Sequence, residues 1–275
     1  MNKKVVLITG ASSGIGQVTA KHLKKEGYTV YGAARRKDKM ERELGSLDIH
    51  CLYLDLTKDE TIVDCVNTII EKEGRIDVLI NNAVYANFGS LEESPTEVVR
   101  MHYEVNILGM GRLNQLVIPH MRKHKFGKIV NLSSGAGKVA GPFNGWYAST
   151  KFAIECLSDT MRIELKHFGI DTIIIIPGAI KTPIARALHD TVLDISGKGI
   201  YAESAKKFSN SIKEFYEKGS PPELMADTIL KAIKSKNPKA RYAAGHSAKK
   251  FLRMRRFLSD RMLDRMVSNW FFKTK

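Results

Sequence analysis

Short runs of Val, Ile and Leu without alternating polar positions recur along the first two thirds of the chain. They occupy residues 4–9, 29–33, 50–54, 78–81, 128–132 and 172–176. A strand covered on both faces has this composition, because neither of its faces meets water. The pattern therefore predicts six buried strands.

Between these runs, apolar residues recur with helical spacing over residues 14–26, 58–72, 96–123 and 147–167. Strands that alternate with helices predict crossover connections and a parallel sheet. The chain has 275 residues and shows no internal repeat or linker. We therefore expect one α/β domain of the Rossmann type, a doubly wound sheet in three layers (α/β/α), over residues 1–245. Residues 246–275 form a basic, helical C-terminal extension of it.

The turn after the first predicted strand is rich in glycine, with Gly10, Gly14 and Gly16 in a G-x-x-x-G-x-G spacing. Such glycines allow a tight turn and let the backbone approach a pyrophosphate at the positive end of a helix dipole. On its own, this spacing could be a simple strand-to-helix connection. Because it follows the first strand and opens a helix, we favour dinucleotide binding. The predicted contacts are Gly10, Ser12, Ser13, Gly14, Ile15 and Gly16.

The end of the second strand bears on the choice of dinucleotide. An acidic residue there would bind the adenosine ribose of NAD, but this chain has Ala34, Arg35 and Arg36. Guanidinium groups bind phosphate in a fork geometry, which suits the 2′-phosphate of NADP. The alternative is a solvated basic turn. We expect NADP(H) rather than NAD(H), with Arg35 and Arg36 among the cofactor-binding residues.

Tyr147 and Lys151 stand four residues apart in a predicted helix, and Ser134 precedes Tyr147 by thirteen residues. Side chains at this spacing share one helix face. A phenol has an unperturbed pKa of about 10, and a nearby ammonium favours the phenolate and lowers that pKa. A hydroxyl such as that of Ser134 can hold a carbonyl oxygen while the phenol protonates it. With a hydride donor alongside, this trio would interconvert a ketone and an alcohol.

In their order along residues 4–183, these motifs resemble those of the short-chain dehydrogenase/reductase family. The matching residues are Thr9–Gly16, Asp55-Leu56-Thr57, Asn81-Asn82-Ala83, Asn106, Ser134, Tyr147, Lys151 and Pro177-Gly178. The resemblance implies that Tyr147 is the acid/base, that Lys151 holds the nicotinamide ribose and lowers the tyrosine's pKa, and that both contact the cofactor. It also implies that Ser134 orients the substrate oxygen and that Asn106 supports a water-linked proton relay.

The same resemblance implies further cofactor contacts, namely Asp55 and Leu56 at the adenine, Asn82 and Ala83 on the adenosine side, Ile180 and Thr182 at the nicotinamide amide, and Pro177 and Gly178. One residue departs from the family pattern. Val84 follows Asn-Asn-Ala where glycine is common. A Cβ at this position restricts the backbone, since glycine is often used where φ must be positive.

The substrate pocket is expected beyond the carboxyl ends of the strands, bordered by residues 135–146 and 180–219. Ser134, Phe143, Trp146, Tyr147 and Ile184 are the predicted substrate contacts, and residues 184–219 are a candidate lid. The rim is largely apolar, and the resemblance points to the branch that handles steroids, retinoids and acyl ketones.

The alternative function is a non-enzymatic NADP(H)-binding sensor of the same fold. The complete catalytic set favours the enzyme.

The net charge of +15 is concentrated near the C-terminus. From residue 230 onward there are fourteen Lys or Arg and only two acidic residues, Asp260 and Asp264. Within residues 249–271, Phe251, Met254 and Leu258 form one helical stripe. Met262, Met266, Trp270, Leu263, Val267 and Phe271 form a second arc. Three alternatives stay open for this basic amphipathic segment: packing on the body, peripheral contact with an anionic membrane surface, and nucleic-acid binding, which we disfavour.

The remaining expectations concern compartment, metals and assembly. The three cysteines lie in apolar segments without metal-ligand spacing, which predicts buried thiols in a reducing compartment. We see neither a signal peptide nor an apolar run of membrane-spanning length, so the prediction is a cytoplasmic protein, with possible peripheral membrane contact. His102, His120 and His124 are expected on a helix surface, with no metal site. The resemblance also implies a homodimer or homotetramer.

Overall fold

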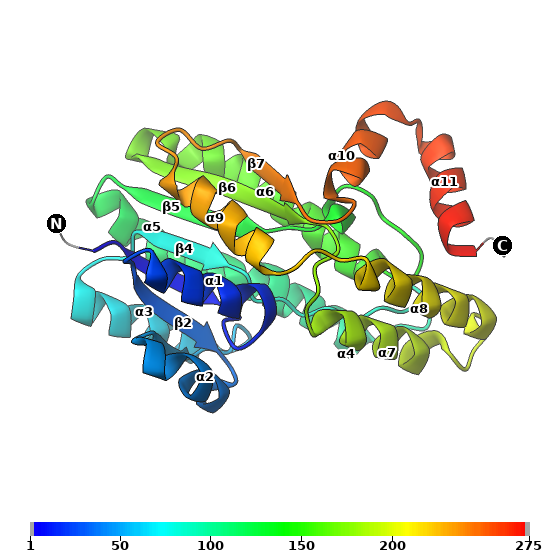
Figure 1. Cartoon of the computed structure of the whole chain (residues 1–275), viewed down its shortest axis with the longest axis horizontal. Helices are drawn as coiled ribbons and strands as arrows, with labels where there is room; N and C mark the ends of the chain where they lie inside the picture. Colours follow the sequence, from blue (N-terminus) through cyan, green and yellow to red (C-terminus); the bar gives the residue numbers. More distant parts are fainter. Residues whose placement is uncertain (1–2, 273–275) are drawn as a thin grey trace.

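The computed structural model describes residues 3–272 and contains a sheet of seven parallel strands (Figure 1). Their order is β3-β2-β1-β4-β5-β6-β7. The strands are β1 (Val5–Thr9), β2 (Thr29–Ala34), β3 (His50–Tyr53), β4 (Val78–Asn81), β5 (Gly127–Leu132), β6 (Ile170–Pro177) and β7 (Arg241–Ala244). The six predicted strands are confirmed. β7 was not predicted, because this half-buried edge strand contains no Val, Ile or Leu.

Two sets of helices cover the two faces of the sheet. One set is α1 (Gly14–Lys25), α2 (Lys37–Leu44) and α9 (Glu223–Lys234), and the other is α3 (Asp59–Glu73), α5 (Met110–Lys123) and α6 (Gly145–Leu165). Neighbouring side chains of a strand enter opposite layers, so Val6 and Ile8 pack with the first set and Leu7 with the second. This arrangement explains why the strands carry no polar alternation. The expected three-layer Rossmann-type fold is confirmed.

Two parts of the helical layers differ from the expectation. The helix α2 was missed because it is short and mostly charged, and buries only Met40 and Leu44. The segment predicted as one helix over residues 96–123 is α4 (Thr96–Tyr103), a π-helical turn η2 (Glu104–Gly109) and then α5. Asn106 lies in that π turn, and such turns are frequent at functional sites.

The predicted lid segment contains a helical hairpin, α7 (Ile184–Ser196) and α8 (Ala202–Glu217). Its inner side forms a separate apolar cluster that includes Phe88, Leu188, Val192 and Phe208. The hairpin lies beyond the carboxyl ends of the strands, on the same side of the molecule as the C-terminal helices (Figure 1). The position is the one expected for a cover over the substrate pocket.

The C-terminal extension forms two helices, α10 (Ala248–Phe257) and α11 (Asp260–Phe272). The predicted break between them is present, and the Ser259 hydroxyl accepts a hydrogen bond from the Met262 amide, at 3.4 Å. Met254, Leu263 and Val267 are buried in one cluster with Val139 of the body. The apolar stripe therefore packs on the body, which was one of the three alternatives. The side chains of Trp270 and Phe271 lie outside the described residues.

Two expectations about single side chains were wrong. Cys65 is buried, but Cys51 is only half-buried and Cys156 is exposed on α6. His102 is not on the surface: it is 1% exposed. Its Nδ1 bonds to the Val98 carbonyl oxygen at 2.9 Å, and its Nε2 accepts the Asn87 amide proton at 3.1 Å. These two bonds occupy both ring nitrogens in a neutral imidazole, and burial lowers the pKa of His102 accordingly.

Large apolar side chains are exposed on the outer faces of η2 and α6, namely Leu108, Phe152, Leu157 and Ile163. The resemblance places a subunit interface on the elements that hold Asn106 and Tyr147, and these faces belong to them. The dimer stays a prediction, which the mass by light scattering at micromolar concentration would check. Across residues 3–272, none of the helices is long and apolar enough to cross a membrane.

Candidate active site

The glycine-rich turn after β1 is held against the turn that follows β4. Thr9 Oγ1 accepts hydrogen bonds from the Asn82 and Ala83 amides at 3.0 and 2.9 Å, and Asn82 Nδ2 donates to the Thr9 carbonyl oxygen at 2.8 Å. Gly10 has a φ of +68°, and a Cβ added there would come within 2.8 Å of Asn82 Nδ2. The two turns therefore need glycine at Gly10 to approach this closely.

These turns border a cavity of about 420 Å³ at the carboxyl ends of β1, β2 and β4. Twelve predicted cofactor residues line it: Gly10, Ser12, Ser13, Gly14, Ile15, Arg35, Arg36, Asp55, Leu56, Asn82, Ala83 and Thr182. The other six predicted cofactor residues do not: Gly16, Tyr147, Lys151, Pro177, Gly178 and Ile180. Val84 also lines this cavity and is not among the residues with positive φ, so its side chain is accommodated without backbone strain.

The chemistry of this cavity fits a phosphate-bearing dinucleotide. Arg36 Nη2 donates to the hydroxyls of Ser12 and Ser13, both at 3.1 Å, so its guanidinium lies over the turn that opens α1. Arg35 lines the same cavity, and β2 ends in Ala34 without a carboxylate. Two guanidinium groups, two hydroxyls and a helix N-terminus are donors that suit the phosphate groups of a dinucleotide.

Two of the predicted catalytic residues, Ser134 and Tyr147, line a second cavity. Burial raises the pKa of Tyr147 to about 12, and a hydrogen bond with Ser134 opposes that rise. The pKa of Tyr147 therefore lies above the usual value of a phenol. That Lys151 lowers it, as the resemblance implies, stays a prediction. At neutral pH the phenol is protonated, which is the state of a proton donor.

Lys151 reaches the same site from one helical turn further along α6. Its Nζ donates to the Leu132 carbonyl oxygen at 2.8 Å and lies 5.7 Å from the centre of the Tyr147 ring. The residue is 4% exposed, and this burial lowers its pKa to about 8. The Lys151 ammonium is therefore held beside the Tyr147 phenol. Because its pKa is about 8, it begins to lose its charge just above neutral pH.

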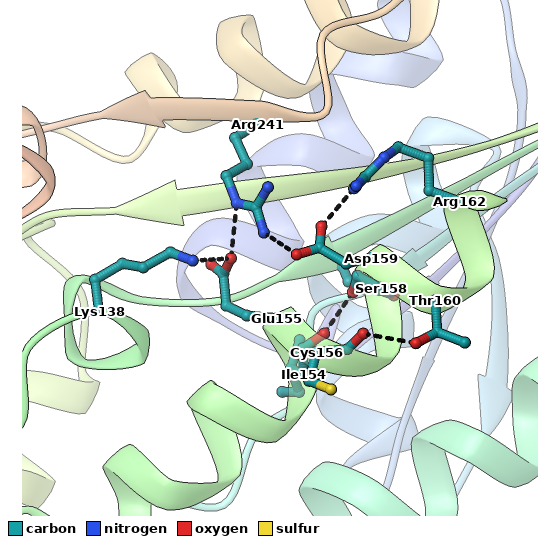
Figure 2. A network of polar contacts seen from close by, with 10 residues as sticks. Lys138, Ile154, Glu155, Cys156, Ser158, Asp159, Thr160, Arg162 and Arg241 are labelled. Atoms are coloured by element: carbon teal, nitrogen blue, oxygen red, sulfur yellow. Dashed lines mark hydrogen bonds and ion pairs between the residues drawn. The ribbon is translucent and has the colours of Figure 1, made fainter. Parts of the chain in front are cut away.

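A network of ion pairs on α6 joins Glu155 and Asp159 to basic side chains (Figure 2). Glu155, one turn after Lys151, is 4% exposed. Its Oε2 pairs with Lys138 Nζ at 2.7 Å and with Arg241 Nε at 2.8 Å, and Arg241 also pairs with Asp159 at 2.6 Å. Among the described residues, Glu155 Oε1 has no hydrogen-bond partner. The charge of Glu155 raises the pKa of Lys151, against the effect of burial.

Asn106, the fourth predicted catalytic residue, is 2% exposed. Its Nδ2 donates to the Tyr85 carbonyl oxygen at 2.9 Å and to Thr150 Oγ1 at 3.1 Å, while its Oδ1 accepts the Tyr85 amide at 2.8 Å. In this geometry Asn106 joins the turn after β4 to the catalytic helix. The structure thus gives it a positioning role, and the proton relay implied by the resemblance stays a prediction.

The second cavity, of about 100 Å³, has mainly apolar walls. Three predicted substrate residues lie elsewhere: Ile184 lines the nucleotide cavity, Phe143 is buried against the Phe208 ring, and the Trp146 indole donates to the Leu91 carbonyl oxygen at 3.3 Å. Pro177 and Gly178, predicted as cofactor residues, line this cavity instead.

Sequence reasoning missed most of the residues that line this second cavity. They include Phe88, Phe208, Tyr216, Phe251 and Val267, from one loop and three helices far apart in the chain. Burial raises the pKa of Tyr216, and a phenolate at Tyr147 would raise it further, so this second phenol is neutral at physiological pH. The helical periodicity of α8 and of the C-terminal extension marks inward-facing positions. Nothing in the sequence says that they face the same cavity.

Several known proteins share this organisation. The model of the short chain dehydrogenase family matches residues 4–192. A 3-ketodihydrosphingosine reductase of Bacteroides thetaiotaomicron is 33% identical over 265 residues, covering 96% of each chain. An NADPH-dependent 3-dehydrocapnine reductase of Ornithobacterium rhinotracheale is 31% identical over 275 residues, covering 96% of this chain and 95% of the relative.

Among solved structures, a short-chain dehydrogenase from Streptomyces avermitilis superposes with a TM-score of 0.81. The two sequences are 29% identical, and the superposition covers 98% of this chain and 96% of the Streptomyces chain. The likeness therefore includes the C-terminal helices as well as the sheet.

Proposed function

Because the chain belongs to the short-chain dehydrogenase/reductase family, an oxidoreductase family acting on carbonyl and alcohol groups, we propose that it is an NADPH-dependent reductase of a long-chain lipid ketone. One observation carries the proposal: a hydrogen-bonded Ser134–Tyr147 pair lies in the wall of an apolar cavity. The pair supplies the proton chemistry, and the cavity supplies the preference for a lipophilic substrate.

The roles of the chain's own groups follow from their positions. The bound nicotinamide cofactor supplies the hydride. Ser134 donates a hydrogen bond to the ketone oxygen, and Tyr147, protonated at neutral pH, transfers its proton to that oxygen as the hydride reaches the carbon. The Lys151 ammonium stabilises the phenolate that this leaves. Asn106 holds the Tyr85 loop against the catalytic helix through its hydrogen bonds to Tyr85 and Thr150.

Family membership by itself leaves NAD(H) and NADP(H) both open. Three observations support NADP(H): Arg35 and Arg36 border the nucleotide cavity, β2 ends without a carboxylate, and one relative is named as NADPH-dependent. Arg36 already makes contacts with Ser12 and Ser13. That leaves Arg35 as the stronger candidate for the 2′-phosphate.

The substrate class rests on the cavity and on the relatives. Phe88, Phe208, Phe251 and Val267 give the cavity a surface suited to an aliphatic chain. Two relatives carry names that specify reduction of a 3-keto group, in a dihydrosphingosine and in a capnine. We therefore place the ketone near one end of the substrate, at Ser134 and Tyr147, with the chain along the apolar walls.

The test follows the loss of nicotinamide absorbance when the protein is given NADPH and 3-ketodihydrosphingosine. The same assay is run with 3-keto compounds of shorter chain for comparison. We expect turnover that increases with chain length, and weaker turnover with NADH. The competing function is a sensor that binds NADPH without turning it over. If NADPH binds and a series of lipophilic ketones and alcohols gives no turnover, the sensor replaces the reductase.

A further inference from the structure

The C-terminal helices form a wall of the substrate cavity with their inner sides. Phe251 of α10 and Val267 of α11 line the cavity that holds Ser134 and Tyr147. Met254 and Leu263 are buried beside them. In Figure 1 both helices stand at the end of the molecule where α8 also lies, beyond the carboxyl end of the sheet. The extension is thus part of the substrate site and not a separate appendage.

The outer sides of the same helices are strongly basic. Between residues 246 and 272 there are seven Lys or Arg and two Asp: Lys249, Lys250, Arg253, Arg255, Arg256, Arg261 and Arg265, against Asp260 and Asp264. Arg255 pairs with Asp260 at 2.6 Å. At 100° per residue, Lys249 and Arg256 point away from the buried Met254, and Arg253 points to its side. Arg261 and Arg265 point away from Leu263.

Apolar side chains are exposed among these cations. Phe257, at the end of α10, is 73% exposed, and Met262, at the start of α11, is 54% exposed. The Arg256 guanidinium lies 5.5 Å from the centre of the Phe257 ring. Exposed aromatic and Met side chains beside Arg and Lys suit the boundary between lipid headgroups and acyl chains. A nucleic-acid backbone would use the cations but would leave these two side chains without a partner.

We propose that the outer face of α10 and α11 docks on an anionic phospholipid bilayer. The cations attract the headgroups, and Phe257 and Met262 enter the interface. Phe251 and Val267 on the inner face then bring the substrate cavity next to the membrane surface, so that an aliphatic ketone passes from the bilayer into the site. This route for the substrate rests on the proposed function, whereas the docking does not.

The first experiment is sedimentation of the full chain with vesicles of phosphatidylcholine alone or with 30% phosphatidylglycerol, at low salt. The test variant is Arg253→Glu with Arg256→Glu and Arg265→Glu. The control variant, Lys25→Glu with Lys72→Glu and Lys123→Glu, makes the same change in net charge on exposed residues at the ends of α1, α3 and α5. These helix ends lie at the opposite end of the molecule (Figure 1).

We expect the wild type and the control to bind the anionic vesicles, and the tail variant to bind at least about tenfold less. Binding to neutral vesicles should be weak for all three proteins. Equal binding by tail variant and control overturns the proposal, because the attraction then comes from net charge alone. Duplex DNA binding that is lost in the tail variant, with no vesicle binding by the wild type, overturns it in favour of nucleic acid.

The second experiment measures turnover of the 3-keto lipid, either embedded in anionic vesicles or carried by cyclodextrin. The tail variant should lose activity with vesicles and keep it with cyclodextrin, because its three substituted residues lie outside the cavity wall. Equal loss in both formats overturns delivery from the bilayer. If the wild type has no activity in either format, the proposed function fails, and sedimentation still decides the docking.

Discussion

The nucleotide cavity and the substrate cavity share one edge of the sheet but are built differently. The nucleotide cavity is formed by short turns directly after β1, β2 and β4, held by hydrogen bonds such as those that the Thr9 hydroxyl accepts from the Asn82 and Ala83 amides. The substrate cavity is formed by side chains of α8, α10, α11 and one loop, held by apolar contacts. The first kind of site depends on residue identity, and the second on residue size and hydrophobicity.

The largest expected effect is at Tyr147, in the wall of the substrate cavity. Tyr147→Phe removes the proton donor and keeps the ring, so kcat should fall by about 10²- to 10⁴-fold, the usual contribution of general acid catalysis. NADPH affinity should stay nearly unchanged. Single-turnover kinetics and NADPH titration by fluorescence measure the two quantities. Retained turnover in this variant would exclude Tyr147 as the acid.

The second prediction concerns the nucleotide cavity alone. Arg35→Ala should weaken NADPH binding by about 1.5–3 kcal/mol, the range for a hydrogen bond to a charged group, and should leave NADH binding nearly unchanged. Lys37→Ala, two residues further on and exposed, is the control for loss of a positive charge. An equal loss of affinity for both nucleotides would show that Arg35 does not bind the 2′-phosphate.

The third prediction concerns the substrate cavity alone. Phe251→Ala removes apolar wall area, and KM for a long-chain ketone carried by cyclodextrin should increase about fivefold to thirtyfold, the equivalent of 1–2 kcal/mol of lost apolar contact. KM for a short ketone should not change. Phe257→Ala, on the same helix but 73% exposed, is the matched control. If the two variants behave alike with the long-chain ketone, α10 does not contact the substrate.

The comparison also explains how much could be predicted from the sequence. Strand positions, the glycine turn and the Tyr147–Lys151 spacing depend on neighbours in the chain, and the fold and twelve residues of the nucleotide cavity followed from them and from the family resemblance. The substrate walls depend on which distant helices meet. The helical period marks Phe251 and Val267 as inward-facing, but only the three-dimensional packing shows that they reach the cavity of Tyr147.

Burial was likewise beyond local reasoning. The four-residue spacing says that Lys151 is near Tyr147, but the direction of the tyrosine's pKa shift depends on how much water both groups lose. Desolvation raises the pKa of Tyr147 to about 12 and lowers that of Lys151 to about 8. His102 was misplaced for the same reason. Its helical position does not reveal that the loop at Asn87 covers it.

The smallest expected effect belongs to Glu155, which lies in neither cavity. Lys151 stabilises the phenolate only as an ammonium, and this form is present below its pKa and is lost as the pH rises through about 8. Because the charge of Glu155 raises that pKa, Glu155→Gln should lower it. The alkaline limb of kcat/KM then moves to lower pH, with a loss of about two- to tenfold at pH 8 and little change at pH 6.

Glu164→Gln, the same change at an exposed position of α6, should leave the pH profile where it is. The ion pairs with Lys138 and Arg241 give Glu155 a structural role as well. If loss of those pairs merely loosened the site, kcat/KM would fall by the same factor at every pH. An alkaline limb that stays in place in Glu155→Gln would therefore show that Glu155 holds α6 to Lys138 and to β7 without tuning Lys151.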